Sequence, residues 1–264
     1  MTLLKLLAAA SLAFAAPKPV SVVSYNVAGV PVVHPKIDAR MKAIGELLAK
    51  SGYDVVALQE VWRDSDAEKL IKASCFPYHA RSKQRWIFGD GLLILSRFKV
   101  LESESISFEH RTQHWLRPDG EQFAHKGALL ARLEAPGGEL DVVDTHFVAD
   151  YDSHQNNEIR AKQTKQLVEW VAQFERGRRY VLAGDLNMAP QDPIMAELLR
   201  GLELRDPCGA SCEHTSRDRR IDYVLASPPI GKEISARVLG DDRVQVGKKS
   251  YHLSDHLPIL AIVQ

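Results

Sequence analysis

The sequence predicts an α/β fold in one domain, in which helices cover mixed β-sheets. Apolar runs typical of buried strands alternate with segments of helical periodicity through most of the 264 residues. Two neighbouring strand-like runs, 128–133 and 140–145, are joined by Pro136-Gly137-Gly138 and therefore predict a hairpin. Because hairpins occur here together with βα units, we expect mixed sheets rather than an all-parallel doubly wound sheet. The length suits one large domain with a sizeable core.

The spacing of apolar residues predicts the elements in chain order. The segment 36–50 is typical of a helix, because it places Met41, Ile44, Leu47 and Leu48 on one face. Other helices are expected at 65–73 and 157–174, and strands at 20–27, 54–58, 92–96, 128–133, 140–145, 180–183, 221–226 and 257–263. The segments 108–126 and 206–220 have neither pattern and are expected to be loops.

The first 16 residues have the layout of a secretory signal peptide. Lys5 precedes an apolar run at 6–14, and small residues follow at Ala15 and Ala16. The alternative, a buried N-terminal helix, lacks the polar face that such a helix needs. The apolar run is too short to span a bilayer, and no later stretch reaches the ~20 apolar residues required. We therefore expect a secreted or periplasmic, soluble monomer whose catalytic domain covers residues 17–264.

Charge and cysteine content narrow the possible partners. Removal of residues 1–16 leaves 33 basic and 34 acidic residues, a formal charge of −1. This balance argues against a nonspecific nucleic-acid binder, which gains affinity from a basic surface. In an oxidising compartment Cys208 and Cys212 can close a small loop and leave Cys75 unpaired. A zinc site is less favoured, since there is no second pair with ligand spacing.

Six apolar strands run directly into acids, amides or histidines. A buried strand tolerates such groups only where they are satisfied or functional, so six cases suggest one shared site. A single histidine is more often a hydrogen-bonded core residue, but together the clusters offer oxygen ligands for Mg²⁺ and a histidine base. The clusters are Ser24-Tyr25-Asn26, Gln59-Glu60, Asp144-Thr145-His146, Gly184-Asp185-Leu186-Asn187, Arg220-Ile221-Asp222-Tyr223 and Ser254-Asp255-His256.

In this order the six clusters resemble the endonuclease/exonuclease/phosphatase superfamily, and the resemblance spans residues 20–264. It implies a four-layer α/β sandwich with two mixed β-sheets flanked by helices. Within the superfamily the chain is most similar to the neutral sphingomyelinases. That branch is indicated by Leu58-Gln59-Glu60-Val61-Trp62, Asp90-Gly91-Leu92, Leu95-Ser96-Arg97, Lys126-Gly127, Thr145-His146-Phe147-Val148-Ala149-Asp150-Tyr151 with Arg160 and Gln163, and Gly184-Asp185-Leu186-Asn187-Met188 with Pro190.

The resemblance implies a Mg²⁺-dependent phospholipid phosphodiesterase that converts sphingomyelin to ceramide and phosphocholine, with Mn²⁺ as a possible substitute for Mg²⁺. It assigns metal binding to Glu60 and Asn26. Asp255 is either a further metal ligand or a residue that supports the ligands, and the number of metal ions, one or two, stays open. It makes His256 the general base and Asp222 the carboxylate that orients its ring. Asp185 and Asn187 would position water and phosphate, and His146 and Lys126 would stabilise phosphoryl oxygens.

One position departs from that branch, which has an acid five residues before the lysine matching Lys126. Glu121 stands five residues before Lys126 and Asp119 seven, so the pairing and the choline selectivity stay open. A lipid substrate also requires contact with a membrane surface. The aromatic segment Trp86-Ile87-Phe88 and Trp115 suit such an interface, although ordinary core positions are an equal alternative.

Two other functions are considered. An exported nuclease would use the same chemistry, but the near-neutral charge and the residues after His146 argue against it. A catalytically silent binding module is disfavoured because every expected catalytic position is filled. The run 240–250 contains Gly247-Lys248-Lys249-Ser250 without the spacing of a phosphate-binding loop, and we interpret it as a charged loop.

Overall fold

The computed structural model describes residues 18–31, 33–83, 89–112, 124–149, 156–174, 177–230 and 234–263. Several predictions concern residues outside these ranges. They are the signal peptide at 1–16, the aromatic residues at 86–88 and 115, and the pairing of Glu121 or Asp119 with Lys126.

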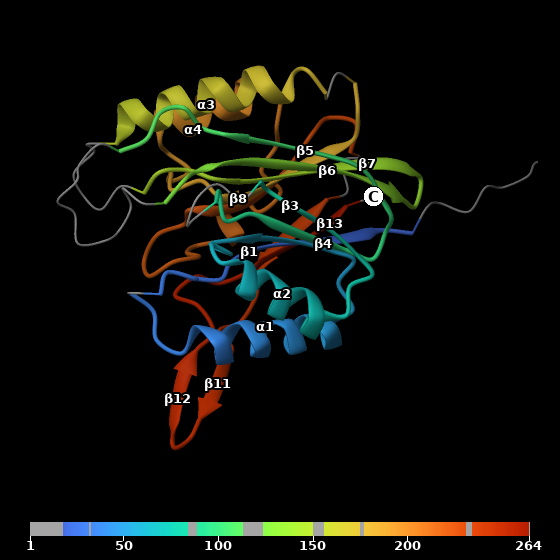
Figure 1. Ribbon diagram of the computed structural model, residues 1–264. Helices are drawn as coiled ribbons and strands as arrows, with labels where there is room; N and C mark the ends of the chain where they lie inside the picture. The colour runs from blue at the N-terminus through green and yellow to red at the C-terminus, as the bar shows by residue number, and fades with distance from the viewer. Residues whose placement is uncertain are drawn as a thin grey trace, which may run out of the picture.

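A six-stranded mixed sheet forms one half of the molecule (Figure 1). β1 is parallel to β2 but antiparallel to β13, which brings the last described strand beside the first. The strand order is β10-β13-β1-β2-β4-β3. Its strands are β1 (Val20–Asn26), β2 (Val55–Gln59), β3 (Tyr78–Arg81), β4 (Leu93–Ser96), β10 (Ser235–Val238) and β13 (Ile259–Val263).

A five-stranded sheet packs face to face on the first, with strand order β5-β6-β7-β8-β9. β7 and β8 are parallel, whereas the other pairs are antiparallel, so this sheet is mixed as well. The predicted hairpin is the β6–β7 pair, which turns after Ala135. The strands are β5 (Val100–Ser107), β6 (Gly127–Ala135), β7 (Gly138–His146), β8 (Tyr180–Asp185) and β9 (Asp222–Ala226).

Helices cover the outer face of each sheet (Figure 1). α1 (Ile37–Ser51) and α2 (Asp64–Ser74) lie on the six-stranded sheet. α3 (Asn157–Val171) and α4 (Pro193–Gly201) lie on the five-stranded sheet. The fold is therefore a sandwich of four layers, and the predicted fold class is confirmed.

Successive residues of the central strands pack into different layers. In β1, Val20 and Val22 enter the core between the two sheets, whereas Val23 packs beneath the helices α1 and α2. In β2, Val55 and Ala57 likewise face the opposite sheet. Strands buried on both faces read as unbroken apolar runs, which is why they were recognisable. A polar side chain at the end of such a strand therefore stands out.

One prediction about the region after residue 240 was wrong. Residues 243–252 form a two-stranded hairpin, β11 (Arg243–Val246) and β12 (Lys249–His252), rather than a charged loop. Gly247 in its two-residue turn has φ 61°, a left-handed conformation that glycine adopts without steric strain. The hairpin projects beyond α1 (Figure 1).

The cysteine prediction is confirmed. Cys208 and Cys212 form a disulfide, and Cys75 is exposed and free. The disulfide closes part of the predicted loop at 206–220, which contains only a short 3-10 helix at Gly209–Ser211.

Candidate active site

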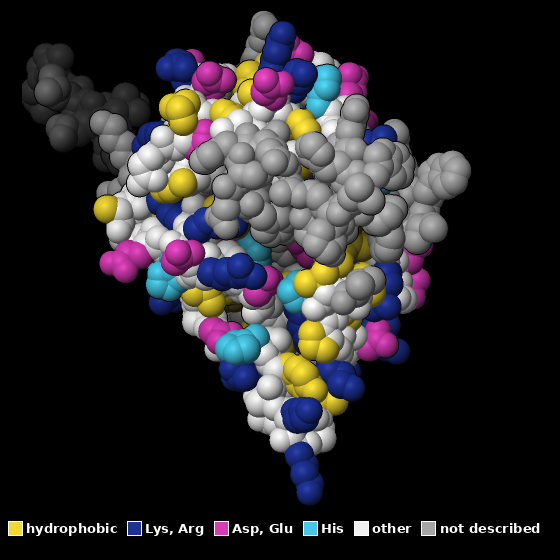
Figure 2. All heavy atoms as spheres, turned by 90° about the vertical axis from the view of Figure 1, so that its left-hand side faces the viewer, with side chains coloured by type: hydrophobic (Ala, Val, Ile, Leu, Met, Phe, Trp, Pro, Cys, Tyr) yellow, Lys and Arg dark blue, Asp and Glu magenta, His cyan; other side chains and the backbone are white. Residues whose placement is uncertain are grey.

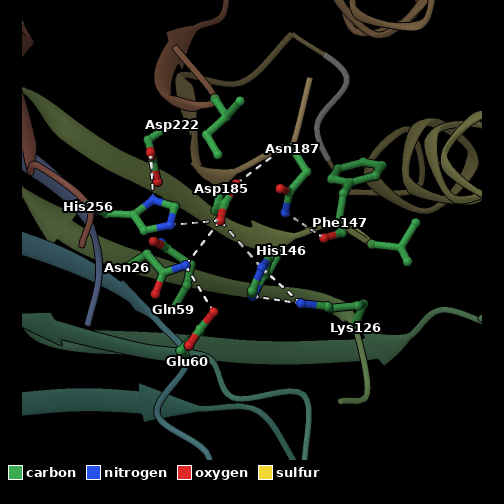
Figure 3. Close-up of polar contacts among 12 residues, drawn as sticks. Asn26, Gln59, Glu60, Lys126, His146, Phe147, Asp185, Asn187, Asp222 and His256 are labelled. Carbon is green, nitrogen blue, oxygen red and sulfur yellow. Dashed lines mark hydrogen bonds and ion pairs between the residues drawn. The ribbon is translucent and has the colours of Figure 1, made fainter. Parts of the chain in front are cut away.

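The registers of the two sheets bring strand ends from both sheets to one edge of the sandwich (Figure 3). Asn26 is level with Gln59 on β2, so Glu60 follows at the same edge. On the other sheet Asp185 is level with both His146 and Asp222. Lys126 precedes the residue paired with His146, and His256 precedes β13, which runs antiparallel to β1. The clusters predicted to share one site do so.

His256 and Asp222 form a buried pair (Figure 3). The ring Nδ1 of His256 lies 2.9 Å from Oδ2 of Asp222, so Nε2 faces Asp185, at 3.9 Å from its Oδ2. Burial alone lowers the pKa of His256, but the charge of Asp222, with help from Asp185 and Asp255, raises it to about 10. The pair therefore favours the imidazolium strongly.

Asp185 stands at the centre of the site. Its Oδ2 accepts a hydrogen bond of 3.0 Å from Nδ2 of Asn26 and lies 3.4 Å from Nε2 of His146. Burial raises the pKa of Asp185, and the neighbouring charge of Asp222 raises it further. Asp185 can thus exchange a proton with its surroundings near neutral pH.

Lys126 and His146 form a buried cationic wall of the site. Nζ of Lys126 lies 2.9 Å from Nε2 of His146 and 5.5 Å from the centre of the Trp62 ring. Burial lowers the pKa of His146 well below its usual value, and the Lys126 charge lowers it further. His146 is therefore neutral, and Lys126 provides the positive charge.

Glu60 has a buried oxygen suited to binding a cation. Its Oε1 accepts a 3.3 Å hydrogen bond from Asn26, whereas the buried Oε2 has no hydrogen-bond partner. A buried carboxylate oxygen without a partner is unfavourable unless a ligand compensates it. Glu60 also has φ 63°, the left-handed backbone that clusters at functional sites. Carboxylate oxygens suit Mg²⁺, so Glu60 fits that ion. Asn26 turns its Nδ2 towards Glu60 and Asp185, and its Oδ1 accepts from the main-chain N–H of Ala28 at 2.9 Å, so its metal role stays a prediction.

A second group of ligand atoms lies close by. One atom from each of Asp185, Asp222 and His256 falls within 4.8 Å of the other two. Asp222 contacts His256 through Oδ2 alone, so its buried Oδ1, like Oε2 of Glu60, has no hydrogen-bond partner and is a second candidate metal ligand.

Asn187 and Asp255 lie farther from this centre. Nδ2 of Asn187 donates to the main-chain oxygen of Phe147 at 3.0 Å, which fixes the side chain beside the pocket. The side chain of Asp255 is 45% exposed and lies 4.0 Å from Nε2 of His34. Both residues line the same pocket of about 460 Å³ as Glu60 and His256. Within the part of the chain that the structure describes, Asp255 forms no hydrogen bond or ion pair with Glu60 or Asn26, so its metal role stays a prediction.

Two functional residues had no signal in the sequence. Arg40 lies on the helix α1, where its buried guanidinium donates to the main-chain oxygens of Val27, Ala28 and Leu253. It thereby ties the end of β1 to the segment that carries His256. His34 lines the pocket from the loop after β1. Neither residue follows an apolar strand directly, so the search for polar residues at strand ends could not identify them.

Gly184 allows the two strands of the five-stranded sheet to meet at the site. Its φ is 153°, and a Cβ there would lie 1.9 Å from the main-chain oxygen of Thr145. Any side chain would therefore push Asp185 away from His146, its partner across the parallel pair.

Residues 23–256 match the model of the endonuclease/exonuclease/phosphatase family. The matched range contains every residue described above as part of the site. The chain belongs to this family. It is 30% identical to a Drosophila melanogaster protein described as a candidate neutral sphingomyelinase, over 91% of this chain and 60% of that protein. It is 26% identical to human sphingomyelin phosphodiesterase 2, over 89% of this chain and 62% of that protein. The chain thus spans about three fifths of the length of these two relatives.

Solved structures share the fold at lower identity. A Staphylococcus aureus beta toxin mutant with bound magnesium ions superposes with a TM-score of 0.74 and 19% identity, over 94% of this chain and 100% of that chain. A D. rerio TDP2 complexed with single strand DNA product gives a TM-score of 0.71 and 21% identity, over 93% and 99%. Within the described residues, no helix is long and apolar enough to cross a membrane.

Proposed function

We propose that this chain is an exported Mg²⁺-dependent phosphodiesterase that hydrolyses a phospholipid, with sphingomyelin as the expected substrate. The observation that carries the proposal is the pocket in which a His256–Asp222 pair faces Asp185 and the unpaired oxygen of Glu60. Relatives named as sphingomyelin phosphodiesterases favour a lipid over a nucleic acid. Apolar lining residues such as Val30, Val33 and Ile221 on the same pocket also suit an amphipathic substrate.

The chain's own residues supply the groups for in-line attack on the phosphorus. Nε2 of His256 accepts the proton of the attacking water, while Asp222 holds Nδ1 and stabilises the resulting cation. The charge of Lys126 stabilises a non-bridging phosphate oxygen. The neutral ring of His146, which lies next to Lys126, helps to position that oxygen. The bond to the lipid alcohol breaks, which leaves a ceramide-type alcohol and a phosphorylated headgroup.

Glu60 and Asn26 would hold the metal ion, with Asp255 as a further ligand. Mg²⁺ bound there would supply positive charge to offset the charge developing on the phosphate, and its charge would favour the neutral form of His256. Glu60 contributes Oε2 to this role, because Oε1 is held by the Asn26 amide.

A substrate panel tests the proposal. Purified protein is incubated with sphingomyelin, phosphatidylcholine, a lysophospholipid and plasmid DNA, each with Mg²⁺ and with EDTA. We expect Mg²⁺-dependent release of phosphocholine from a lipid and no cleavage of DNA. DNA cleavage without lipid hydrolysis would support the nuclease alternative, and inactivity on all four substrates would support a silent module.

A further inference from the structure

One exposed apolar side chain lies beside the catalytic pocket. Within the described ranges, three large hydrophobic side chains are exposed: Val33 (52%), Leu101 (43%) and Tyr78 (40%). The sheet registers place Tyr78, at the start of β3, and Leu101, near the start of β5, at the edge of the sandwich opposite the site. Val33 instead lies in the loop between β1 and α1 and lines the catalytic pocket. A large apolar side chain is thus exposed to water at the mouth of the pocket.

The loop between β1 and α1 forms an apolar lip, which we define as Val30, Pro31, Val33 and Pro35. Val30 also lines the pocket, and both prolines are exposed. No acidic residue occurs between β1 and α1. Figure 1 shows the loop, in blue, protruding from the left-hand edge of the sandwich, and Figure 2 shows that hydrophobic side chains reach the surface on that face. Clustered exposed apolar residues beside a pocket are typical of an interaction surface.

The lip is fixed relative to the metal-binding side of the site. The main-chain N–H groups of Val33 and His34 both donate to the main-chain oxygen of Val30, at 3.2 and 3.0 Å. At the base of the loop, a Cβ on Gly29 would lie 2.0 Å from the main-chain oxygen of Glu60, so the two segments are in direct contact. Whatever contacts the lip is therefore held at a set distance from Glu60.

A basic side chain follows the lip in the sequence. Lys36 is exposed and forms no ion pair with the described residues. The acid nearest to it in the sequence, Asp38, is already paired with Arg63 and Lys69, at 3.3 and 3.0 Å. An apolar surface bordered by an ammonium group suits the boundary between acyl chains and lipid headgroups, where a lysine keeps its charge in water. The charge of Lys36 thus complements the phosphates of a bilayer surface.

The position of Val33 favours a bilayer over a protein as the partner. Val33 lies both on the outer surface and in the wall of the catalytic pocket. A protein seated on the lip would cover the mouth of that pocket, whereas a bilayer covers the lip and delivers the substrate at the same point. We propose that the apolar lip inserts into the surface of a phospholipid bilayer and holds the catalytic pocket against the headgroups. The choice of a bilayer rests on the proposed function, which makes the substrate a lipid.

A fluorescent label on the lip tests the contact directly. Cys75, the exposed free cysteine, is first replaced by serine, so that one new thiol can be labelled with the environment-sensitive dye NBD. The label is introduced by Val33→Cys and, as a matched control, by Leu101→Cys on the opposite edge. The full chain is mixed with vesicles of phosphatidylcholine and sphingomyelin, in Mg²⁺ and again in EDTA, which prevents metal-dependent turnover.

We expect the emission of the label at position 33 to shift to shorter wavelength when vesicles are added. Lipids with brominated acyl chains should quench this emission, because the label then lies at the depth of the chains. The label at position 101 should keep the emission that it has in water.

Unlabelled variants measure how much the lip contributes to binding. Val33→Asp should lower vesicle partitioning about tenfold in flotation assays, roughly what burial of a valine side chain is worth. Leu101→Asp introduces the same charge at a comparably exposed position on the opposite edge and should leave partitioning unchanged. Circular dichroism checks that both variants are folded.

Four results would overturn the lip as a bilayer contact. They are an unchanged label at position 33, equal shifts of both labels, a shift without quenching by brominated chains, and unchanged partitioning of Val33→Asp. A shift that depends on protein concentration without vesicles would overturn it as well and would assign the lip to a second copy of the chain. Failure of the proposed function is distinguishable. In that case the label at position 33 still responds to vesicles, but no phospholipid is hydrolysed in the substrate panel.

Discussion

Replacement of Asp222 by asparagine should both slow the reaction and move its pH dependence. An amide can still contact Nδ1 of His256, at 2.9 Å in the present structure, but it cannot stabilise the imidazolium. Because His256 acts as a base, activity rises with pH through its pKa. Without the carboxylate that chiefly raises this pKa, the pKa falls, and the acidic limb of kcat/KM moves to lower pH.

The magnitude follows from the environment of the ring. The rise of the His256 pKa from 6.5 to about 10 corresponds to about 5 kcal/mol in favour of the imidazolium. Asp222 makes the largest favourable contribution, so we expect Asp222→Asn to lower kcat by about 10²-fold, the lower end of what general-base assistance is worth. His256→Ala should lose about 10²- to 10⁴-fold, the usual value of general-base assistance.

The assay is kcat and kcat/KM against pH for Asp222→Asn, His256→Ala and the double variant, on one lipid at saturating Mg²⁺. The double variant should be little slower than His256→Ala, because residues that act as a unit lose their effect together. Asp141→Asn is the control, since this buried carboxylate contacts Arg132 and Arg178 and lies five residues before His146. Additive losses, an unmoved acidic limb or near-normal activity in His256→Ala would refute the assigned mechanism.

Three further predictions address the metal, the backbone and the N-terminus. Glu60→Gln should abolish activity and weaken Mg²⁺ binding, measured by calorimetry, because the amide removes the anionic ligand; full activity in excess EDTA would contradict this. Gly184→Ala should lower the free energy of unfolding by at least about 2 kcal/mol in urea titrations, since a left-handed backbone and a close carbonyl both oppose the methyl group; unchanged stability would show that the strands meet differently. Protein recovered from outside the cytoplasm should begin near Ala16 or Pro17 by N-terminal sequencing, and an intact Met1 would count against export.

The central strands were predictable because they are buried on both faces. Val20–Asn26 and Val55–Gln59 have almost no solvent-exposed side chain, so the apolar run and its polar end both appear in the sequence. β5 was missed for the opposite reason. It is an edge strand with mostly exposed residues, and its pairing with β6 is made by main-chain groups that leave no compositional signal.

Two other omissions had a signal that was not used. α4 begins with Asp192, which caps Ile194 N, and with Pro193 at the first helical position. The β11–β12 hairpin has an apolar alternation at Val244 and Val246 that ends at Gly247, but its lysines drew attention to charge instead. In both segments the pattern is short, so it predicts a helix or a hairpin only when the neighbouring elements are also considered.

The candidate site was predicted by a rule that works for strand ends alone. His146 and Asp185 end apolar strands and were found, whereas Arg40 acts from the buried face of a helix and His34 from a loop. Distances and proton positions depend on contacts between the two sheets. No local pattern could show that Asn26 links Glu60 to Asp185 across the sandwich.

The pairing of β1 with β13 has a consequence for synthesis. Val20 pairs with Val263 in the sheet register, so β1 lacks one neighbour until residues 259–263 have been made. His256 lies in the segment just before that strand, and it is anchored through Ser254 to the main chain of Asn26. Domains usually begin to fold from the N-terminus as the ribosome proceeds, but His256 follows the other site residues in the sequence and joins them only after they have been made. A nascent chain that stops before residue 256 therefore lacks the histidine that pairs with Asp222.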